Sequence, residues 1–446
     1  MPKKKTALTI EERLQQALVP AEEQPYEVPE NWVWVRLIGN VNSCLDGYRK
    51  PINSSERAKR VGKVPYYGAT GQVGWIDDYL TNEHLVLLGE DGAPFLDLLK
   101  DKAYIIFGEA WVNNHAHILK SYFGEIGNVF LMHYLNMVDY KDYVKGTTRL
   151  KLTQGSMQLM PFPLPPLSEQ QRIVERIEEL FAKLDEAKER LQEVADSFAV
   201  RKAAILHKAF TGELTKQWRW ENGVSYESWE EKKLGEVSFW LGGGTPSTSR
   251  EEYWENGNIL WITSKDMKSA VIEDTLMKVN EIGVKNSSAN YIEKPALLVV
   301  MRSGILRRTF PVAMVKKPFT VNQDLKAIIP DKDDLEFLYW MLLSNEQRIL
   351  DTCMKNGTTV ESINSNALKD LTFKCPTLPE QHEIVRLIDD LLARERSAQQ
   401  AAEQALASID LMKKSILARA FRGELGTNKA SEASALELLK QVLAEN

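Results

Sequence analysis

The chain has 446 residues, of which 43% are hydrophobic and 26% charged, so it is long enough for two or three globular domains with sizeable cores. No apolar run is long enough to cross a bilayer, and the residues after the N-terminal lysines are polar, which argues against a secretory signal. The three cysteines (Cys44, Cys353, Cys375) are far apart, so we expect no disulfide framework, no zinc site and a cytoplasmic location. The formal net charge of −6, taken alone, disfavours binding to nucleic acid.

The charge is unevenly distributed along the sequence. Residues 294–323 contain no acidic side chain, and residues 168–195 and 221–236 are rich in glutamate. Local clusters of this kind decide phosphate binding more than the net charge does. A basic cluster also fits an ordinary solvated surface, so charge alone leaves DNA binding open. The two clusters are Arg49, Lys50, Arg57, Lys59, Arg60 and Lys63, and Lys294, Arg302, Arg307, Arg308, Lys316 and Lys317.

Residues 1–28 are predicted to form an N-terminal helical arm. A cap-like Thr9 precedes glutamates and a short helical pattern that continues to Leu18. We expect the arm to dock partner subunits, with a frayed terminal helix as the alternative.

Residues 29–162 form a first variable module with short apolar runs, such as 85–88 and 104–107, separated by turn signals. This pattern favours a small α/β or mainly β domain. Asn side chains can pair bidentately with adenine, and Arg with guanine, although Asn and Thr also serve local turns. His115 and His117 lack carboxylate or cysteine partners nearby, which disfavours a metal site. The candidate DNA contacts are Arg49, Lys50, Asn113, Asn114, His115, Thr147, Thr148, Arg149 and Lys151.

Residues 163–214 are predicted to form a helical region that contains one long helix. Pro165 and Pro166 prevent an earlier start, no Pro or Gly follows before Gly212, and Gly212 is well placed to end the helix. About 40 residues at 1.5 Å each give roughly 60 Å, which is too long for the interior of one compact domain. We therefore expect the helix to span between domains.

A linker (residues 215–228) leads to a second variable module, residues 229–373, with similar β-rich runs such as 297–301 and 326–329. The module begins with Trp229, which matches Trp32 at the start of the first module. Its polar stretches again favour groove contact, with turn-forming roles as the alternative. The candidate DNA contacts are Thr245, Ser247, Arg250, Lys265, Arg302, Arg307, Arg308, Asn322, Gln323, Thr358 and Thr359.

Residues 374–425 repeat the first helical block at an offset of 211 residues without a gap. The pattern P-x-L-x-E-Q-x-x-I-V occurs at 165–174 and 376–385, and K-x-x-I-L-x-x-A-F-x-G-E-L occurs at 202–214 and 413–425. The same offset relates the G-T-T loops at 146–148 and 357–359. We infer an internal duplication of a variable module and a helical block. Residues 426–446 are predicted to form a C-terminal helical tail.

The apolar positions of both blocks alternate at spacings of three and four, which is typical of a coiled coil. Arg201 interrupts the first seam and Glu395 the second. If a pseudo-twofold axis relates the copies, the helices are antiparallel and carry the modules at opposite ends. The fold class is then α+β, with two globular domains separated by two long helices; two separate surface helices in tandem domains are the alternative. The expected helix-interface residues are Ile173, Ile177, Leu180, Leu184, Leu191, Ile384, Ile388, Leu391, Ile409 and Ile416.

Motifs of catalysis are missing from the sequence. We find no phosphate-binding G-x-x-x-x-G-K-[ST] loop, no dinucleotide fingerprint around glycines 242–244, no N/D-P-P-Y tetrapeptide and no G-x-S-x-G elbow. We therefore expect no catalytic residues, cofactor or metal on this chain, which looks more like a scaffold than an enzyme.

The repeated motifs resemble the conserved regions of type I restriction–modification specificity subunits. The resemblance rests on P-E-N-W (29–32), P-L-P-P-L-S-E-Q-Q-R-I-V (163–174), A-F-T-G-E-L (209–214) and A-F-R-G-E-L (420–425), and covers residues 29–425. It implies that each module reads one half of a bipartite target in double-stranded DNA and that the helices set the spacer. It also implies two modification subunits, which use S-adenosylmethionine, and restriction subunits, which use ATP and Mg. The alternatives are a fused methyltransferase–specificity protein and an adaptor without a DNA role.

Overall fold

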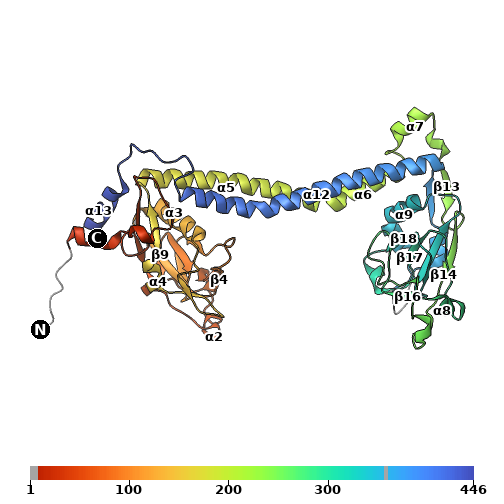
Figure 1. Ribbon diagram of the computed structural model, residues 1–446, viewed down its shortest axis with the longest axis horizontal. Helices are drawn as coiled ribbons and strands as arrows, with labels where there is room; N and C mark the ends of the chain where they lie inside the picture. Colours follow the sequence, from red (N-terminus) through yellow and green to blue (C-terminus); the bar gives the residue numbers. More distant parts are fainter. Residues whose placement is uncertain (1–8, 356–359, 446) are drawn as a thin grey trace. The chain divides into compact units, whose positions relative to one another are not determined.

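The computed structural model describes residues 9–355 and 360–445. The chain divides into two compact units (Figure 1). Unit 1 comprises Met1–Glu193 and Ala402–Asn446, and unit 2 comprises Val194–Ala401. No described helix has both the length and the apolar character that a membrane span requires.

Unit 1 is built on a four-stranded antiparallel sheet in the order β2-β9-β6-β7. Every residue of strand β6 is buried, because helix α3 packs on this sheet and a second apolar cluster forms around β6 and β9. A second sheet has the order β4-β3-β8-β5, with β3 and β8 parallel. The elements are β2 (Asn42–Cys44), β9 (Ala116–Ser121), β6 (Leu85–Gly89), β7 (Ala103–Ile106), α3 (Gly124–Met137), β4 (Gly71–Ile76), β3 (Val64–Gly68), β8 (Glu109–Val112) and β5 (Thr81–Asn82).

Shorter elements complete unit 1. Strands β1 and β12 pair at the point where the chain enters the first long helix, and β10 and β11 form a small hairpin. Helix α1 begins with a capping box of Thr9 and Glu12 and packs against α13, so the helices expected in both terminal segments are present. These elements are α1 (Ile10–Ala17), β1 (Val33–Arg36), α2 (Ser54–Arg57), β10 (Val144–Lys145), β11 (Lys151–Leu152), α4 (Gln154–Leu159), β12 (Pro161–Leu164) and α13 (Ala435–Glu445).

Unit 2 repeats the strand order of the main sheet of unit 1, and its second sheet has three strands in place of four. Its main sheet runs β14-β20-β17-β18 and its second sheet β16-β15-β19, with β15 parallel to β19. Strand β17 is fully buried, like β6, and helix α9 covers its sheet. The elements are β13 (Glu230–Lys233), β14 (Ser238–Gly242), β15 (Ile259–Ile262), β16 (Met277–Val279), α8 (Glu281–Lys285), β17 (Ala296–Val300), β18 (Val312–Val315), β19 (Phe319–Val321), β20 (Leu325–Pro330), α9 (Leu335–Ser344), α10 (Glu346–Cys353), α11 (Ser365–Lys369) and β21 (Thr372–Cys375).

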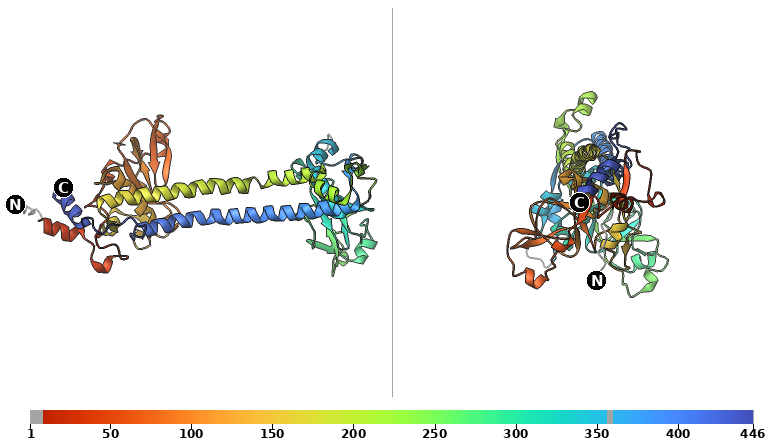
Figure 2. Two further views of the ribbon diagram at one scale, coloured as in Figure 1. Left: turned by 90° about the horizontal axis from the view of Figure 1, so that it is seen from above. Right: turned by 90° about the vertical axis from the view of Figure 1, so that its left-hand side faces the viewer.

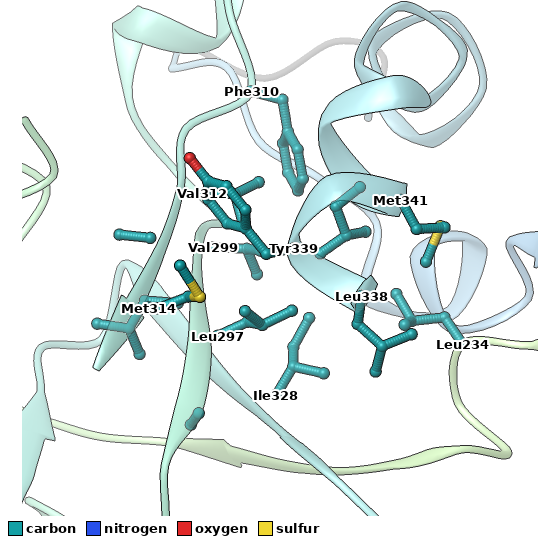
Figure 3. Close-up of a cluster of buried hydrophobic side chains, with 14 of the residues drawn as sticks. Leu234, Leu297, Val299, Phe310, Val312, Met314, Ile328, Leu338, Tyr339 and Met341 are labelled. Carbon is teal, nitrogen blue, oxygen red and sulfur yellow. The ribbon is translucent and has the colours of Figure 1, made fainter. Parts of the chain in front are cut away.

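The core of unit 2 lies between this sheet and α9 (Figure 3). Leu297 of β17, Ile328 of β20 and Leu338 of α9 are each completely buried. Burying a side chain of this size contributes about 1.5–3 kcal/mol. Apolar runs at 297–301 and 326–329 therefore become neighbouring strands because each can bury all of its side chains. The mixed α+β content that the sequence predicted is confirmed.

The single long helix predicted within residues 163–214 is instead two helices, α5 (Leu167–Asp196) and α6 (Phe198–Phe210), and the break is visible in Figure 2. Ser197 interrupts the helix: its hydroxyl donates to the Val194 carbonyl oxygen at 3.1 Å and accepts from the guanidinium of Arg201. Serine side chains compete with the helical backbone in this way, so no Pro or Gly is needed for the interruption. Gly212 follows α6 with φ +76°, as the prediction of a helix terminator requires.

The second block is a single helix, α12 (Leu378–Ala420). In unit 1 the beginning of α5 shares a core with the end of α12, through Ile173, Ile177 and Leu417. In unit 2 the end of α6 shares a core with the beginning of α12, through Leu206 and Ile384. Each unit is thus completed by helix segments from both repeated blocks. Of the predicted interface residues, Ile173, Ile177, Ile384, Ile388 and Ile409 are buried, and Leu180, Leu184, Leu191, Leu391 and Ile416 are half-buried.

The segment expected as a linker, residues 215–228, is ordered. It forms helix α7 (Lys216–Asn222) and a 3-10 turn (Tyr226–Ser228), and it buries Thr215 and Arg219.

Candidate nucleic-acid interface

The polar loops of unit 1 converge at the ends of β6, β8 and the β10–β11 hairpin. Asp91, after β6, accepts hydrogen bonds from His115 Nδ1 at 2.6 Å and Arg149 Nη2 at 2.7 Å. Lys151 Nζ lies 2.8 Å from Oε1 of Glu90. Three predicted DNA contacts from two distant parts of the sequence therefore share one surface. Of the other candidates on this unit, Lys50, Asn114, Thr147 and Thr148 are exposed.

Arg49, also predicted to contact DNA, is a structural side chain. Its guanidinium lies 2.9 Å from Oδ2 of Asp46, forms an ion pair with Glu90 and donates to the Ala116 carbonyl oxygen at 3.1 Å. Burial acts to raise the pKa of Asp46, but the hydrogen bond from His117 and the charge of Arg49 hold that pKa below its ordinary value. The guanidinium thus pairs with two carboxylates within unit 1 and is not among the exposed candidates for phosphate contact.

Cys44, Asp46 and His117 place their potential ligand atoms within 4.8 Å of one another. Asp46 is already bonded to Arg49 and to His117 Nδ1, and His117 Nε2 lies 2.9 Å from the Leu152 carbonyl oxygen. Burial raises the pKa of the Cys44 thiol to about 12, so the thiol keeps its proton at neutral pH. In this structure the three side chains form a partly buried polar network in which Asp46 and His117 already have hydrogen-bond partners.

The polar loops of unit 2 follow β14, β15, β17 and β19. Thr245 Oγ1 donates to Gln323 Oε1 at 2.8 Å, and Arg302 N donates to the Asp324 carbonyl oxygen at 3.3 Å. Among the described residues the Arg302 side chain has no ion-pair partner. Lys265 and Arg308 are exposed as well.

The other candidates of unit 2 have partners within the unit. Arg307 forms an ion pair with Glu361. Ser247 Oγ lies 2.9 Å from Ser249 Oγ, and Arg250 Nη1 donates to the Tyr253 hydroxyl at 2.9 Å. Thr358 and Thr359 lie outside the described residues.

Asn113 and Asn322 are structural, although the sequence predicted both as base contacts. Each side chain is only 8% exposed. Asn113 Oδ1 accepts from the backbone N–H of His115 at 2.8 Å, and Asn322 Oδ1 accepts from that of Asp324 at 3.2 Å. These two asparagine side chains therefore stabilise the local turns through hydrogen bonds, which is the alternative to base contact that the sequence also allowed.

Sequence reasoning missed the acidic residues that organise both surfaces. Asp91 orients His115 and Arg149, and Glu361 fixes Arg307. A search for phosphate-binding residues passes over carboxylates, because their charge opposes DNA. The one available signal was the turn dipeptide of Asp91 and Gly92.

Each unit contains a buried glutamate that accepts hydrogen bonds from distant parts of the chain. In unit 1, Glu169 Oε2 accepts from Trp32 Nε1 at 2.7 Å and from Asn428 Nδ2 at 2.8 Å. In unit 2, Glu380 Oε2 accepts from Trp229 Nε1 at 3.0 Å. Glu169 and Glu380 are the glutamates of the repeated P-x-L-x-E-Q motif, so the glutamate of this motif stabilises the fold of each unit through hydrogen bonds.

Two α+β units with one order of strands in their main sheets, each carrying a polar and basic loop surface, define a duplicated two-module protein. The sequence matches the type I restriction modification DNA specificity domain over residues 29–196 and 226–405, and the chain belongs to this family.

Comparison with individual proteins agrees with this family assignment. The chain is 40% identical over 161 residues to the specificity subunit of the type I restriction enzyme EcoR124I/EcoR124II of Escherichia coli, covering 36% of this chain and 40% of that protein. It therefore spans well under two thirds of that relative. The specificity subunit of EcoDI, also from Escherichia coli, is 23% identical over 457 positions, covering 94% of this chain and 96% of that protein. The crystal structure of the HsdS subunit from Thermoanaerobacter tengcongensis shares the fold, with a TM-score of 0.60 and 18% identity over 90% of this chain and 100% of that chain.

Proposed function

We propose that this chain is the DNA-reading, non-catalytic subunit of a type I restriction–modification enzyme, and that each unit reads one half of a bipartite target. One observation carries the proposal: the two units have the same strand order, and each gathers its polar loops at equivalent strand ends. Side chains presented on such loops are suited to base edges and phosphates. The family match, which includes most of both units, supports the same function.

The helical blocks are proposed to set the distance between the two half-sites. In each unit, helix segments from both blocks pack together in opposite directions. Helix α12 has 43 residues, which corresponds to about 64 Å. A continuous antiparallel coiled coil of α5, α6 and α12 would convert this length into a spacer with a fixed number of base pairs.

Catalysis is proposed to belong to partner subunits. Two modification subunits, carrying S-adenosylmethionine, would dock along the helical blocks, and restriction subunits would bring ATP and Mg. The repetition of both helical blocks supports two copies of one partner. In this assignment the chain binds no cofactor and works in the cytoplasm.

Methylome sequencing tests the proposal. A host carrying this chain with its neighbouring subunits should show adenine methylation at one bipartite motif, and deletion of the chain should abolish it. An unchanged methylome would refute the DNA-reading function and favour an adaptor. Stoichiometric binding of S-adenosylmethionine to the isolated chain would instead identify a fused methyltransferase.

A further inference from the structure

The loop after β8 in unit 1 and the loop after β19 in unit 2 begin in the same way. Each strand runs parallel to one neighbour, β3 and β15 respectively. The first residue beyond the strand then donates its backbone N–H to that neighbour: Asn113 to Tyr67 O at 3.1 Å, and Asn322 to Ile262 O at 3.0 Å. The two loops therefore leave equivalent strands at equivalent positions.

Both loops continue as the same three-residue turn. The buried asparagine accepts a hydrogen bond from the residue two positions later, His115 in unit 1 and Asp324 in unit 2. The carbonyl oxygen of that later residue accepts from the chain leaving the fully buried strand, from Glu90 N at 2.7 Å and from Met301 N at 2.8 Å. The backbone of each turn is thus fixed at both ends by the core of its unit.

The middle residue of each turn is a carboxamide that points outward. Asn114 and Gln323 are exposed, in contrast to the asparagines that precede them. Among the described residues, the Asn114 side chain has no hydrogen-bond partner, whereas the backbone carbonyl oxygen of Asn114 accepts from Arg49 Nη1 at 3.5 Å. Gln323 accepts from Thr245 through Oε1, which orients its amide and leaves Nε2 without a partner in the described part of unit 2.

A cationic residue lies close to each middle residue. In unit 1, Arg149 Nη2 lies 3.4 Å from Nδ1 of His115, next in sequence to Asn114. In unit 2, the backbone N–H of Arg302 donates at 3.3 Å to the carbonyl oxygen of Asp324, next in sequence to Gln323, and Arg302 is exposed. A carboxamide on a fixed backbone near a cationic residue is suited to contact a base edge, because the cation attracts the DNA backbone while the amide contacts a base.

We propose that Asn114 and Gln323 are the equivalent base-reading side chains of the two units, and that each reads the adenine of one A·T pair. A carboxamide offers one acceptor and one donor, which match the N6 amino group and N7 of adenine in the major groove. This inference rests on the proposed function and specifies its reading surface. It also explains why Asn113 and Asn322 are buried: they position the readers and touch no base themselves.

The test uses the full chain assembled with its modification subunits. Duplexes carry the target found by methylome sequencing, with each recognised base pair replaced in turn, and their affinities are measured for Asn114→Ala and Gln323→Ala. Each variant should lose discrimination at one A·T pair of one half-site, by roughly 5- to 150-fold, and keep it at every other position. Gln158→Ala and Gln347→Ala, which remove exposed carboxamides elsewhere in the same units, should change nothing.

Three results would overturn the inference. Both variants could keep full discrimination at every position, they could lose affinity equally for all duplexes, or the affected pair could be G·C. A wild-type complex that prefers no sequence would instead refute the proposed function itself, so the two failures are distinguishable. Unchanged thermal unfolding of each variant shows that any altered preference arises from reading and not from misfolding.

Discussion

In unit 2, Arg219 Nη1 lies 2.6 Å from Oε1 of Glu380, and both side chains are buried. Glu380 also accepts hydrogen bonds from Thr215 and Trp229, so the side chains of three residues donate to this one carboxylate. Among the described residues, the side-chain donors to the equivalent carboxylate of unit 1, Glu169, are all neutral. The same motif position therefore carries an ion pair in one unit and a neutral network in the other.

This difference predicts unequal effects of the same substitution. Glu380→Gln leaves the Arg219 guanidinium buried without a counter-charge, which should lower the free energy of unfolding by about 3–5 kcal/mol. Glu169→Gln should cost less than about 1 kcal/mol, because a glutamine oxygen can still accept from Trp32 and Asn428. Urea denaturation of the full chain, with hydrogen exchange to locate the effect, measures both. Equal losses for the two variants would contradict this account.

The sequence predicted much of the fold because the repeat exposes equivalent positions. Trp32, Trp229 and the motif glutamates stood out as repeated residues, but their hydrogen bonds did not, since pairing between distant segments depends on the folded chain. The break at Ser197 could not be predicted, because a serine within a helix disrupts it only when its hydroxyl finds suitable partners. In the candidate site, residue type alone could not separate buried Asn113 from exposed Asn114.

The two residues that interrupt the apolar seams pair with each other. Arg201 Nε lies 2.5 Å from Oε2 of Glu395 in unit 2. Because both side chains are partly exposed, a double-mutant cycle with Arg201→Ala and Glu395→Ala should give a coupling of about 1 kcal/mol. A separate double variant with leucine at both positions should be at least as stable as the wild type, since two leucines restore the apolar seam. A coupling near zero in chemical denaturation would show that the pair contributes nothing.

Replacement of the glycine in the first F-x-G-E-L motif is predicted to lower the stability of the fold more than replacement of a nearby glycine does. Gly212 has φ +76°, and a Cβ added there would lie 2.4 Å from Cε2 of Tyr226, whose ring stacks on Arg219. Gly223 has a similar φ of +66° but open space around it. Gly223→Ala should cost only the left-handed backbone strain, about 1–2 kcal/mol, and Gly212→Ala clearly more. Thermal unfolding compares them, and equal midpoints would rule out a steric role for Gly212.

Acid should weaken unit 1 through Glu178. A hydrogen bond from His133, with Nε2 to Oε1 at 2.7 Å, lowers the pKa of Glu178 from its ordinary value of 4.5. A carboxyl whose folded pKa is depressed stabilises the fold above its unfolded pKa and loses this contribution as the pH falls through the folded value. The stability difference between wild type and Glu178→Gln should therefore be largest above about pH 4.5 and vanish in stronger acid. In a His133→Gln background the same substitution should show much less pH dependence.

The spacer proposal predicts a defined response to a longer helix. Four helix-forming residues inserted next to Ala195 in α5 add one turn, about 6 Å, which equals one or two base pairs of DNA. The methylated motif should keep both half-sites and gain one or two unspecified base pairs between them. The same four residues inserted between Asn222 and Gly223, beyond the end of α7, should leave the motif unchanged. Altered half-sites in the α5 variant would show that the helices take part in reading the bases rather than in spacing the two units.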